Sequence, residues 1–221
     1  GGASAPSRVD SEPSGTGAVV PPTVAVPRSY FAMHYNNPET PWPAVAGAVG
    51  AVRIWDAGGA QWSEIQPTAA DEDWSVLDAR LATAEANGAD VVYTLGGRTP
   101  RWASAQPDAF SPYGPGQCAE PSTMTRWTDW VREIATRYRG RITLWEIWNE
   151  PDVPGFYCGT ADQLVELAHQ AYLVLKEVDP SNRVLSPGFA SSIGHLDYFL
   201  ARGGGNWSDI ISFHFYVSTP E

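Results

Sequence analysis

The amino-acid sequence predicts an α/β fold, a (β/α)₈ barrel of which this chain carries about six β/α units. Short apolar segments alternate with longer amphipathic segments along most of the chain, which is typical of repeated βα units. The apolar segments are continuous, as expected for parallel strands that are covered on both faces. Polar residues and tryptophans gather directly after these segments, where the loops of such barrels carry their chemistry.

Six apolar segments are expected to form the strands. They comprise residues 29–35, 51–58, 89–96, 141–149, 183–188 and 209–217. A complete barrel has eight strands and about 250 residues. We therefore expect two β/α units to lie outside this chain, which would make it a barrel truncated after its sixth strand.

Four amphipathic segments are expected to form helices between the strands. They comprise residues 71–88, 122–140, 160–180 and 191–205. Gly88 and Gly140 stand where a helix ends, and Thr160 with Gln163 has the pattern of a capping box. Several tryptophans recur at helical spacing and are expected to be structural, namely Trp74, Trp127 and Trp130.

A doubly wound sheet is the competing architecture. A dinucleotide-binding fold of that kind carries a glycine-rich phosphate loop after its first strand, and no such loop follows residues 29–35. The barrel is therefore preferred, and a dehydrogenase or another doubly wound enzyme is disfavoured.

Residues 1–28 predict a disordered leader, because they are rich in Pro, Ser, Gly and Ala and have no sustained period. Residues 29–221 would then form the partial barrel domain. The chain begins with Gly1, so we expect a processed or trimmed product. A tail of this kind often follows an export signal or a membrane anchor, which favours an extracellular or cell-envelope location.

The charge balance restricts the partners. Fourteen basic and 25 acidic residues give a net charge of -11. Nucleic acid and anionic membrane surfaces need clustered Lys and Arg, so neither is expected as a partner. No apolar run approaches the roughly 20 residues of a membrane span. A neutral substrate such as a sugar is compatible with this composition.

The two cysteines, Cys118 and Cys158, both fall in loop-like segments. We expect a disulfide between them, because free exposed thiols are uncommon in exported proteins. Two unlinked thiols are the alternative. There is no zinc-type cysteine cluster, and four scattered histidines make no metal site. We therefore expect neither a metal nor an organic cofactor.

Three motifs carry a resemblance to a known family. They are WEIWNEPD (145–152) at the end of the fourth strand, FHFY (213–216) in the sixth, and TPRWA (99–103) after the third. Over about residues 29–221 the chain resembles the retaining glycoside hydrolases of clan A, most closely family 39 and its relatives, with family 5 next. The resemblance implies hydrolysis of an O-glycosyl bond in an oligosaccharide, a polysaccharide or another glycoside.

Within this resemblance Glu150 is expected to be the general acid and base, because glycoside cleavage needs a carboxylic acid that protonates the leaving oxygen. Asn149 is expected to bind a sugar hydroxyl. Successive strand residues point to opposite faces, so both reach the pocket only if the strand ends there, as Pro151 suggests. Glu146 lies roughly 13 Å deeper along the strand. We therefore expect Glu146 to be a paired structural acid that lies away from the sugar.

The nucleophile of the clan is a glutamate at the end of the seventh strand. Glu221 lies five positions after Tyr216, and a parallel crossover needs a dozen or more residues. We therefore expect the nucleophile beyond residue 221, and no hydrolysis by residues 1–221 alone.

Further residues are expected to bind the substrate. These residues are Arg53, His214, Tyr216, Trp102 and His34. The alternative for Arg53 is an ordinary ion pair, and the alternative for His214 and Tyr216 is a place in the packed core. Trp102 and His34 could instead lie without contact to the substrate. A non-catalytic carbohydrate-binding protein on the same fold is the rival function, since such a protein would keep the tryptophans and tolerate loss of the second carboxylate.

Overall fold

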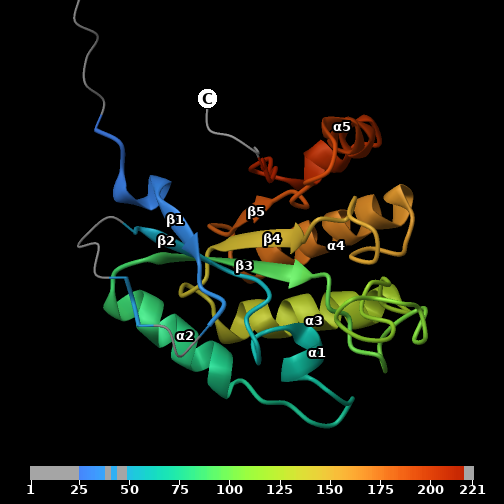
Figure 1. Cartoon of the computed structure of the whole chain (residues 1–221), viewed down its shortest axis with the longest axis horizontal. Helices are drawn as coiled ribbons and strands as arrows, with labels where there is room; N and C mark the ends of the chain where they lie inside the picture. The colour runs from blue at the N-terminus through green and yellow to red at the C-terminus, as the bar shows by residue number, and fades with distance from the viewer. Residues whose placement is uncertain (1–24, 38–40, 44–48, 217–221) are drawn as a thin grey trace, which may run out of the picture.

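A parallel sheet of five strands, wound in one direction, forms the centre of the molecule (Figure 1). The computed structural model describes residues 25–37, 41–43 and 49–216. The strands follow in the order β1 (Ala32–His34), β2 (Ala51–Ile54), β3 (Asp90–Gly96), β4 (Leu144–Trp148) and β5 (Arg183–Leu185). A doubly wound sheet reverses its strand order, whereas a barrel does not. The fold is therefore an incomplete (β/α)₈ barrel.

The helices confirm the expected alternation. They are α1 (Trp62–Ile65), α2 (Ser75–Ala86), α3 (Met124–Arg137), α4 (Ala161–Val178) and α5 (Ile193–Ala201), with 3₁₀ turns η1 (Arg28–Tyr30) and η2 (Gly204–Trp207). The capping box of Thr160 and Gln163 starts α4 as predicted. The single turn α1 was not expected from the sequence, because four residues are too few to show a helical period.

The hydrophobic core lies between the sheet and the helices that cover one of its faces. Ile54, Tyr93 and Trp145 of three successive strands belong to the same buried cluster as the apolar residues of α2, α3 and α4. The rings of Trp62 and Trp74 stack on Trp130, with centroid distances of 5.2 and 5.8 Å. This burial confirms the structural role predicted for the helical tryptophans.

The opposite face of the sheet is polar. Arg53, Thr94 and Glu146 alternate with the core residues of β2, β3 and β4, and neighbouring residues of a strand point to opposite faces. Strand register places Thr94 beside Glu146 and His34 beside Arg53. In a barrel this face is the interior, so the polar residues point toward the barrel axis.

The predicted sixth strand over residues 209–217 is wrong as a regular strand. In its described part only two isolated bridges form, Leu185 with Ile210 and Phe189 with Phe213. Pro187 has no N–H to donate to a ladder, and Ile211 and Phe215 are exposed. The segment still runs beside β5, since the N–H of His214 donates to the carbonyl of Phe189 at 2.7 Å.

Most of the predicted leader, residues 1–24, lies outside the described residues. Arg28, at its end, is bound to the folded part of the chain, because its guanidinium donates to the carbonyls of Val49 and Asn87 at 2.7 and 2.6 Å. None of the helices in the described ranges has the length and hydropathy of a membrane span.

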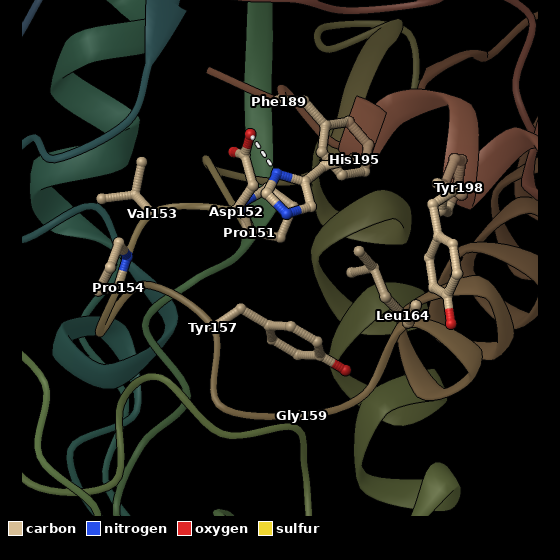
Figure 2. A pocket seen from close by; sticks show the side chains of 12 residues that line it. Pro151, Asp152, Val153, Pro154, Tyr157, Gly159, Leu164, Phe189, His195 and Tyr198 are labelled. Atoms are coloured by element: carbon tan, nitrogen blue, oxygen red, sulfur yellow. Dashed lines mark ion pairs between the residues drawn. The ribbon is translucent and has the colours of Figure 1, made fainter. Parts of the chain in front are cut away.

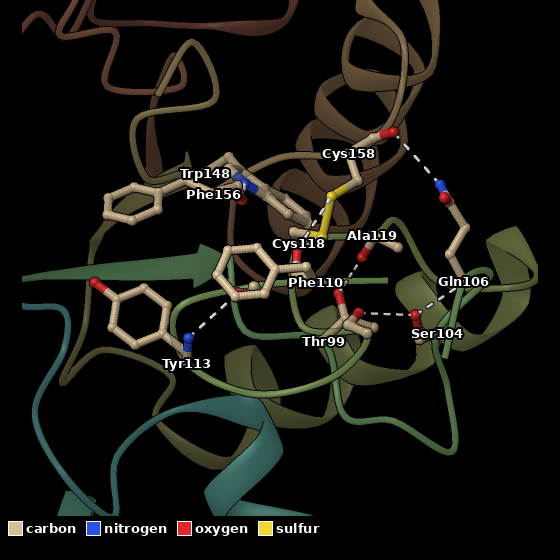
Figure 3. The surroundings of a disulfide bond; sticks show 12 residues. Thr99, Ser104, Gln106, Phe110, Tyr113, Cys118, Ala119, Trp148, Phe156 and Cys158 are labelled. Atoms are coloured by element: carbon tan, nitrogen blue, oxygen red, sulfur yellow. Dashed lines mark hydrogen bonds between the residues drawn. A yellow bond between two sulfur atoms is a disulfide. The ribbon is translucent and has the colours of Figure 1, made fainter. Parts of the chain in front are cut away.

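The predicted disulfide between Cys118 and Cys158 is confirmed (Figure 3). It joins the long connection between β3 and α3 to the connection between β4 and α4, with the Cα atoms 5.3 Å apart. These connections also carry Tyr113 and Phe156, whose ring centroids lie 5.4 Å apart. The disulfide therefore fixes two loops at the carboxyl-terminal end of the sheet.

Replacing both cysteines by serine should lower the free energy of unfolding by about 4 kcal/mol, because the disulfide closes a loop of 40 residues. Chemical denaturation of the protein and of the double variant measures this difference. Equal stability of the two proteins under oxidising conditions would show that the crosslink does not hold the loops together.

Candidate active site

The chain turns sharply where β4 ends. The strand stops at Trp148, and Glu150 has a φ of 43°, in the left-handed region that L-residues rarely adopt. The N–H of Glu150 donates to the carbonyl of Gly188 at 2.9 Å, and the N–H of Gly188 donates to the carbonyl of Trp148 at 2.9 Å. This turn brings Asn149 and Glu150 to the same pocket, as their proposed roles require.

A pocket with a volume of about 180 Å³ lies at the carboxyl-terminal end of the sheet. It is lined by His34, Asn36, Trp55, Asp56, Tyr113, Asn149, Glu150, Phe156 and Tyr216. Asp56 also has a positive φ, 54°, and in the described part of the chain only it and Glu150 do so among residues other than glycine. Strained backbone of this kind gathers at functional sites.

Glu150 lines the pocket. One of its carboxylate oxygens, Oε1, lies 2.7 Å from Nδ1 of His214 and accepts from the Tyr216 hydroxyl at 3.4 Å. The described residues offer Oε2 no hydrogen bond. The side chain is 15% exposed. The two partners therefore hold Oε1, and the remaining hydrogen-bonding capacity of the carboxylate lies on Oε2.

A second carboxylate, Glu146, is committed to a buried network. Its Oε2 accepts from Nε of Arg53 at 2.9 Å and from the Thr94 hydroxyl at 2.6 Å, and its Oε1 accepts from the Ser212 hydroxyl at 2.9 Å. A second guanidinium nitrogen of Arg53 also binds Oε2. The side chain is only 1% exposed, so Glu146 is the paired structural acid that the sequence predicts.

Glu146 nevertheless lies close to the site, and the expectation that it stands away from it is wrong. Besides Glu146, the Arg53 guanidinium binds two residues of the site. It donates to Oδ1 of Asn149 at 2.8 Å and to Nε2 of His34 at 2.7 Å. His214 approaches Glu146 from the other side. Arg53 and His214 are long enough to contact both Glu146 and the residues at the end of the strand. The network around Glu146 therefore lies next to the residues of the pocket.

The charge of Glu146 is maintained against its burial. Burial alone would raise its pKa, but the Arg53 guanidinium and hydrogen bonds from its neighbours outweigh this effect and lower the pKa from 4.5 to about 2. The pKa of His34 is also lowered, first by burial and then by Arg53, and for a histidine this favours the neutral form. A neutral His34 fits its role as acceptor of the Arg53 N–H.

His214 lies between the carboxylates of Glu146 and Glu150. Its Nδ1 binds Glu150, and its Nε2 lies 3.8 Å from Oε1 of Glu146, an ion-pair separation beyond hydrogen-bond length. Glu146 is the largest influence that raises the pKa of His214, burial opposes it, and Glu150 adds to the rise. These influences favour the protonated form of His214 beside the pocket.

The close approach of His214 depends on the absence of a side chain at Gly188. A Cβ there would come within 2.6 Å of Nε2 of His214 and 2.8 Å of Oε1 of Glu146. Nothing in the sequence marks this glycine, because its need arises only when the two loops meet.

Of the predicted site residues, the structure brings six together and separates one. Glu150, Asn149, His34 and Tyr216 line the pocket, while Arg53 and His214 bind these residues from behind. Trp102 is half-buried beside a different pocket, where its indole N–H donates to the carbonyl of Gln66 at 2.9 Å.

Asp56, Tyr113 and Phe156 of the pocket were not predicted as site residues. Asp56 and Asn36 follow closely after the ends of strands, where the loops of a barrel carry its functional residues. This position in the sequence could have indicated them as site residues. Tyr113 and Phe156 lie in irregular loops without a period. Thr94, which holds Glu146, was signalled by a hydroxyl within an otherwise apolar strand.

Across the part of the chain that the structure describes, no group of three or more His, Cys, Asp or Glu side chains is arranged to hold a metal ion.

Solved structures with a similar fold include glycoside hydrolases. A family 39 glycoside hydrolase from Bacteroides cellulosilyticus is 21% identical, with a TM-score of 0.55 over 77% of this chain and 34% of its own. A family 39 enzyme from Xanthomonas axonopodis is 20% identical, with a TM-score of 0.61 over 84% of this chain and 40% of its own.

Xylanase B from Clostridium stercorarium is 16% identical, with a TM-score of 0.59 over 86% of this chain and 63% of its own. This chain therefore spans about a third to two thirds of the length of these structures. No model of a protein family matches the sequence, and no curated protein matches it. At these identities the likeness shows the fold, an incomplete (β/α)₈ barrel.

Glu146→Gln should lower the free energy of unfolding at neutral pH by about 3–5 kcal/mol, because it leaves the buried Arg53 without its counter-ion. The depressed pKa of Glu146 also predicts a pH dependence. Its stabilisation is present above about pH 4.5 and is lost as the pH falls toward about 2. Denaturation between pH 2 and 7 should show a smaller acid-induced loss in the variant.

Glu177→Gln is the matched control, because Glu177 forms an exposed ion pair with Arg132. Such pairs contribute about 0–1 kcal/mol. If the two variants have similar stability at neutral pH, the account of a buried network around Glu146 is wrong.

Proposed function

We propose that the protein containing this chain is a retaining glycoside hydrolase in which Glu150 is the general acid and base. The observation that carries the proposal is the state of the Glu150 carboxyl. It stands at the end of β4 and lines a pocket, with Oε1 held by His214 and Tyr216 and with no hydrogen bond to Oε2 from the described residues. The likeness of the fold to glycoside hydrolases supports the same function.

In the first step Glu150 gives a proton to the glycosidic oxygen as the bond from this oxygen to the anomeric carbon breaks, and the nucleophilic carboxylate bonds to that carbon to form the glycosyl-enzyme. The proton comes from the pair of His214 and Glu150, and His214 accepts a hydrogen bond or donates one as the charge of Glu150 changes. In the second step the Glu150 carboxylate takes a proton from the water that attacks the glycosyl-enzyme. Burial of the pair strengthens both transfers.

The remaining pocket residues hold the sugar. Asn149 is oriented by Arg53 through its Oδ1, so its amide N–H₂ is left to donate to a hydroxyl. His34 and Tyr216 border the same space, and Trp102 stays a proposed contact for a longer substrate. Asp56 is an added proposal, because Arg98 binds its Oδ1 at 3.1 Å and leaves Oδ2 to accept from a sugar hydroxyl.

The nucleophile is proposed to lie outside residues 1–221. Glu146 cannot serve, because Arg53, Thr94 and Ser212 occupy both of its oxygens. The similar structures extend well beyond the part that this chain matches. A glutamate at the end of a seventh strand of the barrel would face Glu150 across the pocket.

The substrate is proposed to be a neutral oligosaccharide, polysaccharide or other glycoside, cleaved without a cofactor. An extracellular or cell-envelope location is proposed from the disulfide, since such bonds persist in oxidising compartments. The net charge of -11 disfavours nucleic acid as a partner.

Glu150→Gln in the full-length protein should lower kcat/KM on an alkyl glycoside by about 10²–10⁴-fold, because glutamine cannot donate the proton. On a dinitrophenyl glycoside of the same sugar the glycosylation step should fall far less, since that leaving group needs no protonation. A panel of aryl glycosides and polysaccharides identifies the sugar to use.

Glu166→Gln is the control, because Glu166 lies on an exposed face of α4, and its activity should equal that of the wild type. Full activity of Glu150→Gln on the alkyl glycoside would contradict the role given to Glu150. Binding of polysaccharide without any turnover by the full-length wild type would instead establish the carbohydrate-binding alternative.

A further inference from the structure

Asp152 joins the Glu150 loop to the loop that follows β5. Its Oδ1 accepts from the N–H of Ala190 at 3.0 Å, and its Oδ2 accepts from the N–H groups of Ser191 and Ser192 at 2.8 and 3.2 Å. The Ser191 hydroxyl donates to the same Oδ2 at 2.8 Å. The Asp152 side chain is 1% exposed. We call these four bonds the Asp152 clamp.

The clamp lies two residues from the most strained point of the site. Glu150 holds a φ of 43° and precedes a proline, and proline disfavours helical conformations in the residue before it. A conformation of this kind is strained and persists only where its surroundings enforce it. The single hydrogen bond from Glu150 to Gly188 holds the near side of the turn, and the clamp holds the far side.

Packing does not replace the clamp, because the loop stands over a cavity. Behind residues 151–154 lies a space of about 340 Å³, bordered by Tyr157, Leu164, Phe189 and Tyr198 (Figure 2). Figure 2 shows Asp152 at the edge of this space, with the His195 ring beside it. Nδ1 of His195 lies 3.5 Å from Oδ2 of Asp152. Side chains that would press the loop into place are therefore absent on this side, within the residues that the structure describes.

The Asp152 carboxyl is held in its charged form. Burial would raise its pKa, but the hydrogen bonds from Ala190, Ser191 and Ser192 outweigh burial and lower it. The three N–H groups precede α5, which begins after its cap Ser192. Hydrogen bonds from N–H groups to a charged acceptor are about twice as strong as those between neutral groups.

We propose that Asp152 is a positioning residue, which keeps the Glu150 carboxyl at the pocket by fixing the strained turn to the loop after β5. The inference rests on the proposed function, since Glu150 must be the proton donor for its position to matter. Asp152 itself lines the cavity behind the loop and is not among the residues that line the pocket of Glu150. Its loss should therefore impair proton donation and leave sugar binding nearly intact.

The experiment compares Asp152→Asn with the wild type in the full-length protein. The substitution is nearly isosteric, but it turns one acceptor oxygen into an N–H₂ group that faces N–H donors. On an alkyl glycoside kcat should fall by about 10- to 100-fold with little change in KM, because a displacement of about 1 Å costs that much. On the dinitrophenyl glycoside the fall should be several times smaller.

Amide hydrogen exchange supplies a readout that does not depend on activity. The N–H groups of Ala190, Ser191 and Ser192 should exchange faster in Asp152→Asn. Asp108→Asn is the matched control, because Asp108 forms an exposed ion pair with Arg101 in another loop, and it should change neither readout. If Asp152→Asn does not fold, Ser191→Ala removes one bond of the clamp and should show the same pattern on a smaller scale.

Each outcome separates this inference from the proposed function. An equal loss on both glycosides, or full activity despite faster exchange, would overturn the positioning role while Glu150→Gln still supports the hydrolase. A full-length wild type that hydrolyses no glycoside would overturn the proposed function, and this inference with it.

Discussion

The buried ion pair of Arg53 and Glu146 determines how the site is built. β4 carries Glu146, and the turn after it carries Glu150 and Asp152. The ion pair holds Glu146 charged and inaccessible, so Glu146 is not available for chemistry. The same guanidinium donates to Asn149 and His34, while Glu146 is the largest influence that raises the pKa of His214 beside Glu150. Glu150, by contrast, lines the pocket. Because Arg53 and hydrogen bonds lower the pKa of Glu146 to about 2 despite its burial, the ion pair stays charged well below neutral pH.

Three separate restraints hold the Glu150 turn in a conformation that it would not adopt alone. The hydrogen bond to Gly188 ties it to the neighbouring strand, the Asp152 clamp ties it to the loop after β5, and the disulfide ties its connection to that of β3. All three cross between different βα units of the barrel. The geometry of the site therefore depends on the docking of the units, and a catalytic group on a strained loop gains a fixed position from a rigid scaffold.

The sequence indicated the fold and part of the site because those signals are local. Strand and helix alternation, the capping box of α4 and the position of Glu150 before a proline can all be read within short windows. The place of Glu146 could not, since it depends on long side chains from β2 and the segment after β5. The sixth strand was misjudged because a strand needs a partner that pairs along its length.

A structure of the full-length protein with a non-hydrolysable substrate analogue tests the central claim most directly. The account predicts the bridging oxygen or sulfur of the analogue within about 2.6–3.2 Å of the Glu150 carboxyl, with Glu146 still bound to Arg53. An analogue bound at another site, or a bridging atom in contact with a carboxyl other than that of Glu150, would contradict it.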